Sequence, residues 1–92
     1  MLSIVKAQYL TDYKLSIEFS DGRSGIIDLE SMVYSFKPFH SLQDKNLFSK
    51  FEVDYTIRWS DELDIAPEYL YFKAFEKDQN LKPLFDEWGY VA

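Results

Sequence analysis

The chain has 92 residues, of which 47% are hydrophobic and 18% aromatic, which suits a single domain, residues 1–92, with one core. It contains no cysteine, and this excludes disulfides, thiolate metal sites and a cysteine nucleophile. The net charge of −6 and the scattered basic residues argue against direct nucleic-acid binding, while the lack of a signal peptide or a long apolar run predicts a cytoplasmic protein without membrane contact.

The first third of the chain predicts an antiparallel meander of three strands. Residues 4–10 are rich in β-branched and apolar types and end at a turn-forming pair. Residues 14–20 alternate between apolar and polar side chains, as a half-buried strand does. Asp21 and Gly22 then reverse the chain, because both tolerate the backbone angles of a tight turn.

The register of this hairpin depends on the length of its loop. A two-residue loop would turn Ile26 toward the apolar side of the second strand. A three-residue loop, with Gly22 as a left-handed bulge residue, would instead turn Ile27 and Leu29 that way. We prefer the three-residue loop, because it buries two large residues rather than one.

Two helices are expected next. Apolar residues at i, i+3, i+4 and i+7 predict a helix over residues 29–36, capped by Asp28 and ended by Lys37-Pro38. Ser41 and Asp44 resemble a capping box that starts a second, short helix. The apolar side of this second helix would consist of Leu47, Phe48 and Phe51.

The second half of the chain predicts one more strand and two more helices. Residues 52–59 alternate strictly and should join the same sheet. Pro67 suits the first turn of a helix, so we interpret residues 69–75 as helical although a strand also fits their composition. A C-terminal helix would begin at Asn80 and end at Gly89. The fold class is therefore α+β: an antiparallel sheet of about four strands, with short helices packed on one face.

Four motifs together resemble the small bacterial domain-of-unknown-function family 2442 (DUF2442). They are Phe19-Ser20-Asp21-Gly22, Ile27-Asp28-Leu29, the segment from Leu42 to Phe48, and the long segment from Trp59 to Tyr71. The resemblance covers residues 3–72 and leaves residues 73–92 as a C-terminal extension that carries the amphipathic helix.

The resemblance implies an α+β domain without an established activity. Members of the family are often encoded beside another small uncharacterised protein, and in some chains the domain precedes a helix-turn-helix, which implies a binding or regulatory module. The motif residues that we expect to be mainly structural are Asp21, Gly22, Asp28, Trp59, Asp64 and Pro67.

The polar residues do not form a recognisable catalytic or metal-binding pattern. His40 is the only histidine, and Asp61, Glu62 and Asp64 lack the spacing of a calcium loop. Asp64 could cap the segment that starts at Pro67, or it could pair with Arg58. An enzyme would need Asp64, Glu68, Arg58 or His40 to converge in one cleft. We therefore expect no enzyme, and we assign no catalytic residue, cofactor or metal ligand.

Aromatic residues are unusually abundant for a domain of this size, and some should form a partner surface. The candidates are Tyr69, Phe72, Leu81, Leu84, Phe85, Trp88 and Tyr90. Packing of the tail within its own chain would use the same residues. The sequence thus favours a non-enzymatic protein-interaction module, with a protein partner or a second copy of the chain. The alternative is an antitoxin-like or transcription-linked component that acts with a separate DNA-binding or toxin partner.

Overall fold

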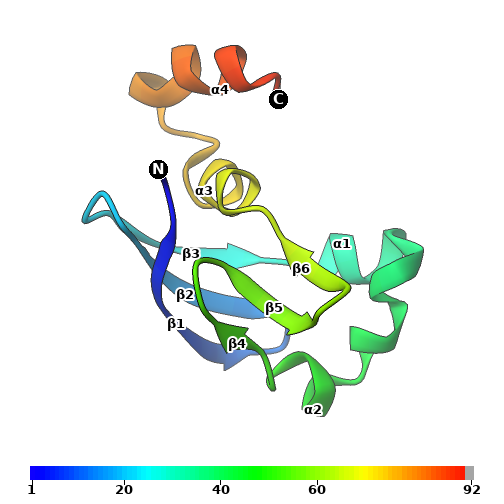
Figure 1. The fold of residues 1–92 in the computed structure, drawn as a ribbon. Coiled ribbons are helices and arrows are strands. Elements are labelled where there is room, and N and C mark those ends of the chain that lie inside the picture. The colour runs from blue at the N-terminus through cyan, green and yellow to red at the C-terminus, as the bar shows by residue number, and fades with distance from the viewer. Residues whose placement is uncertain (91–92) are drawn as a thin grey trace.

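The structure is a computed structural model, and it describes residues 1–90. Strands β1 (Ile4–Thr11), β2 (Lys14–Phe19) and β3 (Ser24–Asp28) form an antiparallel sheet in that order, which we call sheet A (Figure 1). This confirms the predicted meander.

The loop between β2 and β3 has the predicted three residues. The backbone N–H of Phe19 donates to the carbonyl oxygen of Arg23 at 2.8 Å, and Gly22 has a φ of +90°. Leu15 consequently lies opposite Ile27. Ile27 is buried while Ile26 is 61% exposed, so the choice of register is confirmed.

The prediction of a single strand over residues 52–59 is wrong. The structure has two strands there, β4 (Glu52–Val53) and β5 (Ile57–Ser60), and β6 (Leu63–Ile65) completes a second antiparallel sheet, sheet B. The physical reason is Asp54, whose Oδ1 accepts hydrogen bonds from the backbone N–H groups of Tyr55 and Thr56. Such a side-chain bond to the local backbone competes with the strand and turns the chain. The fold class is α+β as predicted, and residues 1–90 contain six strands in two sheets instead of about four in one.

The first two helices are shorter than predicted. Helix α1 covers Glu30–Ser35, a 3₁₀ helix follows at Lys37–Gln43, and α2 covers Lys45–Phe48. Leu29 occupies the N-cap of α1, although Oδ1 of Asp28 still accepts from the N–H of Glu30 at 3.0 Å.

Two residues that were assigned to the apolar sides of these helices are exposed. Phe36 follows α1 and is 54% exposed, and Leu47 is exposed on α2. The cap of α2 is Asp44, because Ser41 lies inside the 3₁₀ helix.

The C-terminal part is helical, as predicted. Helix α3 covers Pro67–Phe75, a short 3₁₀ helix covers Gln79–Leu81, and α4 covers Lys82–Trp88. Gly89 closes α4 with a φ of +86°. Asn80 is not the cap: Leu81 holds the N-cap of α4, and the carboxylate of Asp78 caps the 3₁₀ helix. No helix within residues 1–90 combines the length and the apolar character that a membrane crossing requires.

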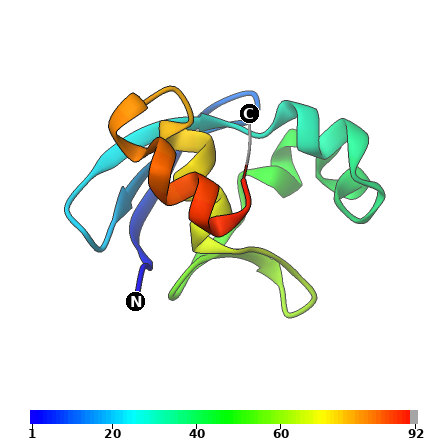
Figure 2. The same cartoon turned by 90° about the horizontal axis from the view of Figure 1, so that it is seen from above.

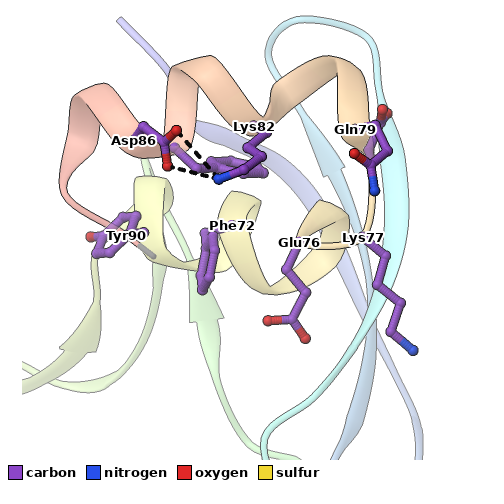
Figure 3. A pocket seen from close by; sticks show the side chains of 9 residues that line it. Phe72, Glu76, Lys77, Gln79, Lys82, Asp86 and Tyr90 are labelled. Atoms are coloured by element: carbon purple, nitrogen blue, oxygen red, sulfur yellow. Dashed lines mark hydrogen bonds and ion pairs between the residues drawn. The ribbon is translucent and has the colours of Figure 1, made fainter. Parts of the chain in front are cut away.

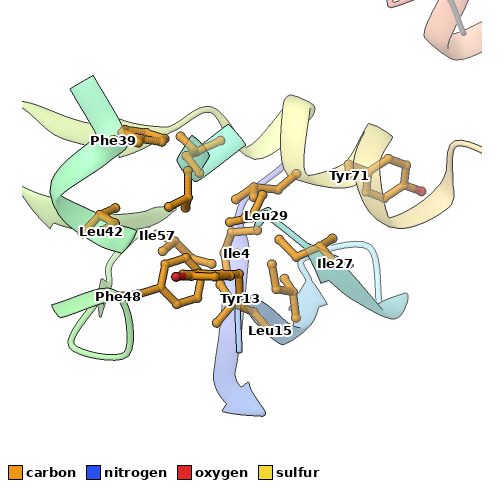
Figure 4. Packing of buried hydrophobic residues seen from close by; sticks show 14 of the residues in the cluster. Ile4, Tyr13, Leu15, Ile27, Leu29, Phe39, Leu42, Phe48, Ile57 and Tyr71 are labelled. Atoms are coloured by element: carbon orange, nitrogen blue, oxygen red, sulfur yellow. The ribbon is translucent and has the colours of Figure 1, made fainter. Parts of the chain in front are cut away.

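The buried apolar residues form one cluster (Figure 4). The inner face of sheet A supplies Leu15, Ile17 and Phe19, whereas Lys14 and Glu18 on the opposite face are exposed. The core extends to sheet B and reaches α4 through Phe85.

Phe48 lies at the middle of the core and is completely buried. Its ring centroid is 5.2 Å from that of Tyr13 and 5.6 Å from that of Trp59. The indole N–H of Trp59 donates to the carbonyl oxygen of Phe48 at 2.8 Å. Two of the family-like motifs therefore meet in the core, one through Phe48 and the other through Trp59.

Candidate interaction surface on helices α3 and α4

Helix α3 is held close to sheet A by a glycine. A Cβ atom placed on Gly25 of β3 would lie 3.2 Å from the Cβ of Ala74 and 3.2 Å from the ring of Phe75. These distances are shorter than most contacts of a real Cβ atom, so any side chain at this position would push α3 outward by a few tenths of an ångström. On the same side of the sheet, the ring of Phe19 packs edge-on against Tyr71 at 4.9 Å between centroids.

A polar contact joins α3 to the β2–β3 turn. The hydroxyl of Tyr71 donates to Oδ2 of Asp21 at 2.7 Å, and Oδ1 of Asp21 accepts from the backbone N–H of Arg23 at 2.9 Å. Burial of the phenol, with the Asp21 hydrogen bond as the second cause, raises the pKa of Tyr71 to about 12. The guanidinium of Arg23 also lies 3.8 Å from the carboxylate of Asp78, just beyond α3. The turn therefore fixes both the middle and the C-terminal end of α3.

Five aromatic residues, which we call the aromatic cluster, lie where α3 and α4 meet: Tyr69, Phe72, Phe85, Trp88 and Tyr90. The ring of Phe72 is 5.1 Å from that of Phe85 and 5.2 Å from that of Tyr90. The rings of Tyr69 and Tyr90 are 5.9 Å apart. Phe85 is buried and the other four are half-buried against the core.

The structure thus brings together the residues that were predicted to form a partner surface. Leu81 and Leu84 are half-buried as well and pack against the same core. The rings contact one another within one chain, and their contact with a partner stays a prediction. The last two residues of the predicted extension, 91–92, lie outside the described part of the chain.

A pocket of about 230 Å³ opens between α3 and α4 (Figure 3). Phe72, Phe85 and Tyr90 form its apolar wall. Its rim is charged and polar, with Glu76, Lys77, Asp78, Gln79, Lys82 and Asp86. On this rim, Nζ of Lys82 lies 3.3 Å from a carboxylate oxygen of Asp86. An apolar wall with a polar rim suits a bulky apolar side chain that enters from outside.

Two other pockets are lined by fewer aromatic side chains than the pocket between α3 and α4. One of about 390 Å³ lies beside β3 and the end of α3, with Phe75 as its aromatic residue. The other, of about 200 Å³, lies over the outer face of sheet A and has no aromatic lining residue. The pocket between α3 and α4 is therefore the best candidate of the three for an apolar ligand group.

The polar residues considered for chemistry do not come together. His40 is exposed in the first 3₁₀ helix, and Arg58 pairs with Asp54 at 2.9 Å and with Asp61 at 3.5 Å. Asp64 is exposed and lies opposite Arg58 in the β5–β6 ladder, but within residues 1–90 it neither caps α3 nor forms an ion pair with Arg58. Arg58, His40, Asp64 and Glu68 line none of the three pockets. Among residues 1–90, no group of three or more histidine or acidic side chains is placed to hold a metal ion.

The fold and this surface define a small α+β domain with two antiparallel sheets and a C-terminal pair of helices. The chain belongs to the DUF2442 family, described as proteins of unknown function, whose model matches residues 4–76. The match extends four residues beyond the predicted 3–72 and includes all of α3. Helix α4 lies outside the matched region.

One solved structure has a similar fold. It is the crystal structure of a protein from Nitrosomonas europaea named "Putative DNA Binding Protein", with a TM-score of 0.71 and 18% sequence identity. The likeness covers 84% of this chain and 51% of that chain, so the present chain spans about half the length of that protein. No curated protein matches the sequence.

Proposed function

We propose that this chain is a non-enzymatic protein-interaction domain of the cytoplasm, and that its contact surface is the aromatic cluster with the pocket between α3 and α4. The observation that supports the proposal most is the pocket itself, with three rings on its wall and six polar residues on its rim. Energetically dominant interface residues are commonly aromatic side chains that fill such pockets, surrounded by polar residues that exclude water. A pocket of about 230 Å³ matches one large apolar side chain of a partner.

The test compares two single-residue variants of the full chain. Tyr90→Ser removes one ring from the pocket wall. Tyr55→Ser is the control: it removes a more exposed tyrosine in the loop between β4 and β5, which does not line the pocket. Proteins that co-purify with the tagged wild type and with each variant are quantified by mass spectrometry. Each enriched protein is then purified, and its affinity for the three forms is measured by titration calorimetry.

The proposal expects a partner whose affinity falls at least tenfold with Tyr90→Ser and stays unchanged with Tyr55→Ser. Circular dichroism verifies that both variants are folded. Partners that bind the Tyr90→Ser variant as tightly as the wild type would refute the assignment of this surface.

A second candidate function is transcription-linked or antitoxin-like regulation, in which the chain acts with a separate DNA-reading or toxin partner. What favours it is the fold shared with a protein named for DNA binding, of which this chain spans about half. The net charge of −6 favours a DNA-reading part outside this chain. The chain alone should leave the fluorescence anisotropy of labelled duplex DNA unchanged, whereas the complex of the chain with the co-purified partner should raise it. Tight, salt-sensitive binding by the chain alone would contradict this division of roles.

A further inference from the structure

The C-terminal segment is attached to the rest of the domain by apolar contacts alone. Within residues 1–90, no hydrogen bond or ion pair joins residues 79–90 to residues 1–77. The Lys82–Asp86 ion pair, for example, lies entirely within α4. Figures 1 and 2 show α4 as the outermost element, lying along α3 on the side away from the sheets.

Ring contacts supply this attachment. Phe85 lies 5.1 Å from Phe72 and 6.3 Å from Tyr71, and Trp88 lies 6.0 Å from Tyr71, between ring centroids. Apolar burial does not depend on direction. Because no polar pair joins α4 to α3, no polar contact requires that the α4 packed on α3 comes from the same copy of the chain. The outer face of α3 therefore accepts any helix with the pattern of α4, and a second copy of the chain carries that pattern by definition.

The chain leaves the helical conformation between α3 and the 3₁₀ helix that precedes α4. Glu76 still has helical angles, with φ −60° and ψ −21°, whereas Asp78 is extended, with φ −81° and ψ 109°. The Asp78 carboxylate accepts from the N–H of Asn80 at 2.9 Å and lies 3.8 Å from the guanidinium of Arg23. These two exposed side-chain contacts hold the turn together with two backbone hydrogen bonds, from Asp78 N–H to the Phe75 oxygen and from Leu81 N–H to the Asp78 oxygen. A change of ψ at Asp78 would move α4 as a unit.

We propose that α4 exchanges between two copies of this chain, with α4 of each copy docked on α3 of the other. The inference rests on the proposed function, since it assigns a partner to the same surface. In the exchanged dimer, Phe72 from one copy and Phe85 from the other would form the wall of one pocket. The arrangement is a symmetric two-chain exchange, which makes the same ring contacts as the closed monomer.

The balance between monomer and dimer is set by the turn and by the concentration. The short linker keeps α4 near α3 of the same copy at an effective concentration on the order of millimolar. α4 of another copy competes with it mainly at high protein concentration, so the wild type exchanges mainly under that condition. Asp78→Ala removes the two side-chain contacts of the turn in both copies at once and keeps its backbone hydrogen bonds. It should increase the dimer fraction about tenfold at a given low concentration, since two sets of exposed contacts are lost, each worth a few-fold.

The exchange is tested by cross-linking two full-length variants, which is possible because the chain contains no cysteine. Tyr69→Cys and Tyr90→Cys place one thiol each at ring positions that are 5.9 Å apart. The two variants are mixed over a concentration series and treated with a short bismaleimide reagent. A covalent heterodimer forms efficiently only where α3 of one copy lies beside the α4 end of another. The control pairs Tyr69→Cys with Tyr55→Cys, and Tyr55 lies in the loop between β4 and β5.

The proposal expects a covalent dimer that grows with concentration, exceeds the control, and increases about tenfold when Asp78→Ala is added to both chains. Cross-linking no greater than the control overturns it. A dimer seen by light scattering without this cross-link also overturns it, because such a dimer would use another face. If exchange is absent while a co-purified partner still depends on Tyr90, the exchange is refuted and the proposed function stands. Circular dichroism confirms folding of each variant before it is mixed.

Discussion

Replacing Tyr71 by phenylalanine should destabilise the domain by removing a single polar contact between distant parts of the chain. The Tyr71 hydroxyl donates to Oδ2 of Asp21 at 2.7 Å and is the side-chain link between α3 and the β2–β3 turn. The ring itself remains in Tyr71→Phe, so its packing on Phe19 and Phe75 is kept. The variant thus isolates the hydrogen bond.

The expected cost is about 1 kcal/mol in the free energy of unfolding. A hydrogen bond to a charged group contributes about 1.5–3 kcal/mol. The lower end applies and is reduced further here, because the Asp21 side chain is 37% exposed and water can replace the lost donor. For a domain of this size, about 1 kcal/mol corresponds to a fall in Tm of roughly 4–8 °C.

Urea unfolding followed by tryptophan fluorescence measures this change directly. Tyr55→Phe is the control, since the Tyr55 side chain is exposed in the loop between β4 and β5 and its replacement should leave stability unchanged. A double-mutant cycle with Asp21→Asn should give a coupling energy of about 1 kcal/mol between the two side chains. A coupling energy near zero, or a Tyr71→Phe variant as stable as the wild type, would refute the role assigned to this contact.

Three further predictions concern the core and the response to pH. Phe48→Ala should cost about 3–5 kcal/mol in urea unfolding, because Phe48 is completely buried at the centre of the core; a loss below about 1 kcal/mol would contradict this. Gly25→Val should cost about 1–3 kcal/mol in thermal unfolding, because its side chain would collide with Ala74, and an unchanged Tm would show that α3 moves freely. Stability should fall between pH 10 and pH 12. The hydrogen bond with Tyr34, followed by burial, raises the folded-state pKa of Tyr13 to about 12 from 10.0. Burial, followed by the hydrogen bond to Asp21, raises the folded-state pKa of Tyr71 to about 12 from 10.0. Their contribution is therefore complete below pH 10 and is lost as the pH rises through 12. A urea midpoint that does not change over this range would contradict the last prediction.

The hairpin could be predicted because apolar and polar side chains alternate along it, and helix α3 because Pro67 suits the first turn of a helix. Ile27 and Leu29 fix the register of β3, since a shift by one residue would expose both. Sheet B could not be predicted, because residues 52–59 alternate as a strand does while the local hydrogen bonds of Asp54 break the strand in the middle. Alternation cannot reveal a competing bond between a side chain and its neighbouring backbone.

The sequence could predict which residues form the candidate surface, but it could not predict which other parts of the fold those residues contact. The apolar spacing in α4 identified Phe85 and Trp88 as members of one face, and the structure places them against α3. The contact between Asp21 and Tyr71 was missed, because the two residues are 50 positions apart and no local pattern joins them. Their presence in two separate family-like motifs was the one signal that could have suggested a contact.

Hydrogen exchange measured by mass spectrometry, with and without the partner identified by co-purification, tests the assignment of the contact surface most directly. Our account predicts that binding slows exchange in residues 69–90, where the aromatic cluster and the pocket lie, and leaves residues 14–28 of sheet A unchanged. Slower exchange confined to sheet A or sheet B, with residues 69–90 unaffected, would contradict it.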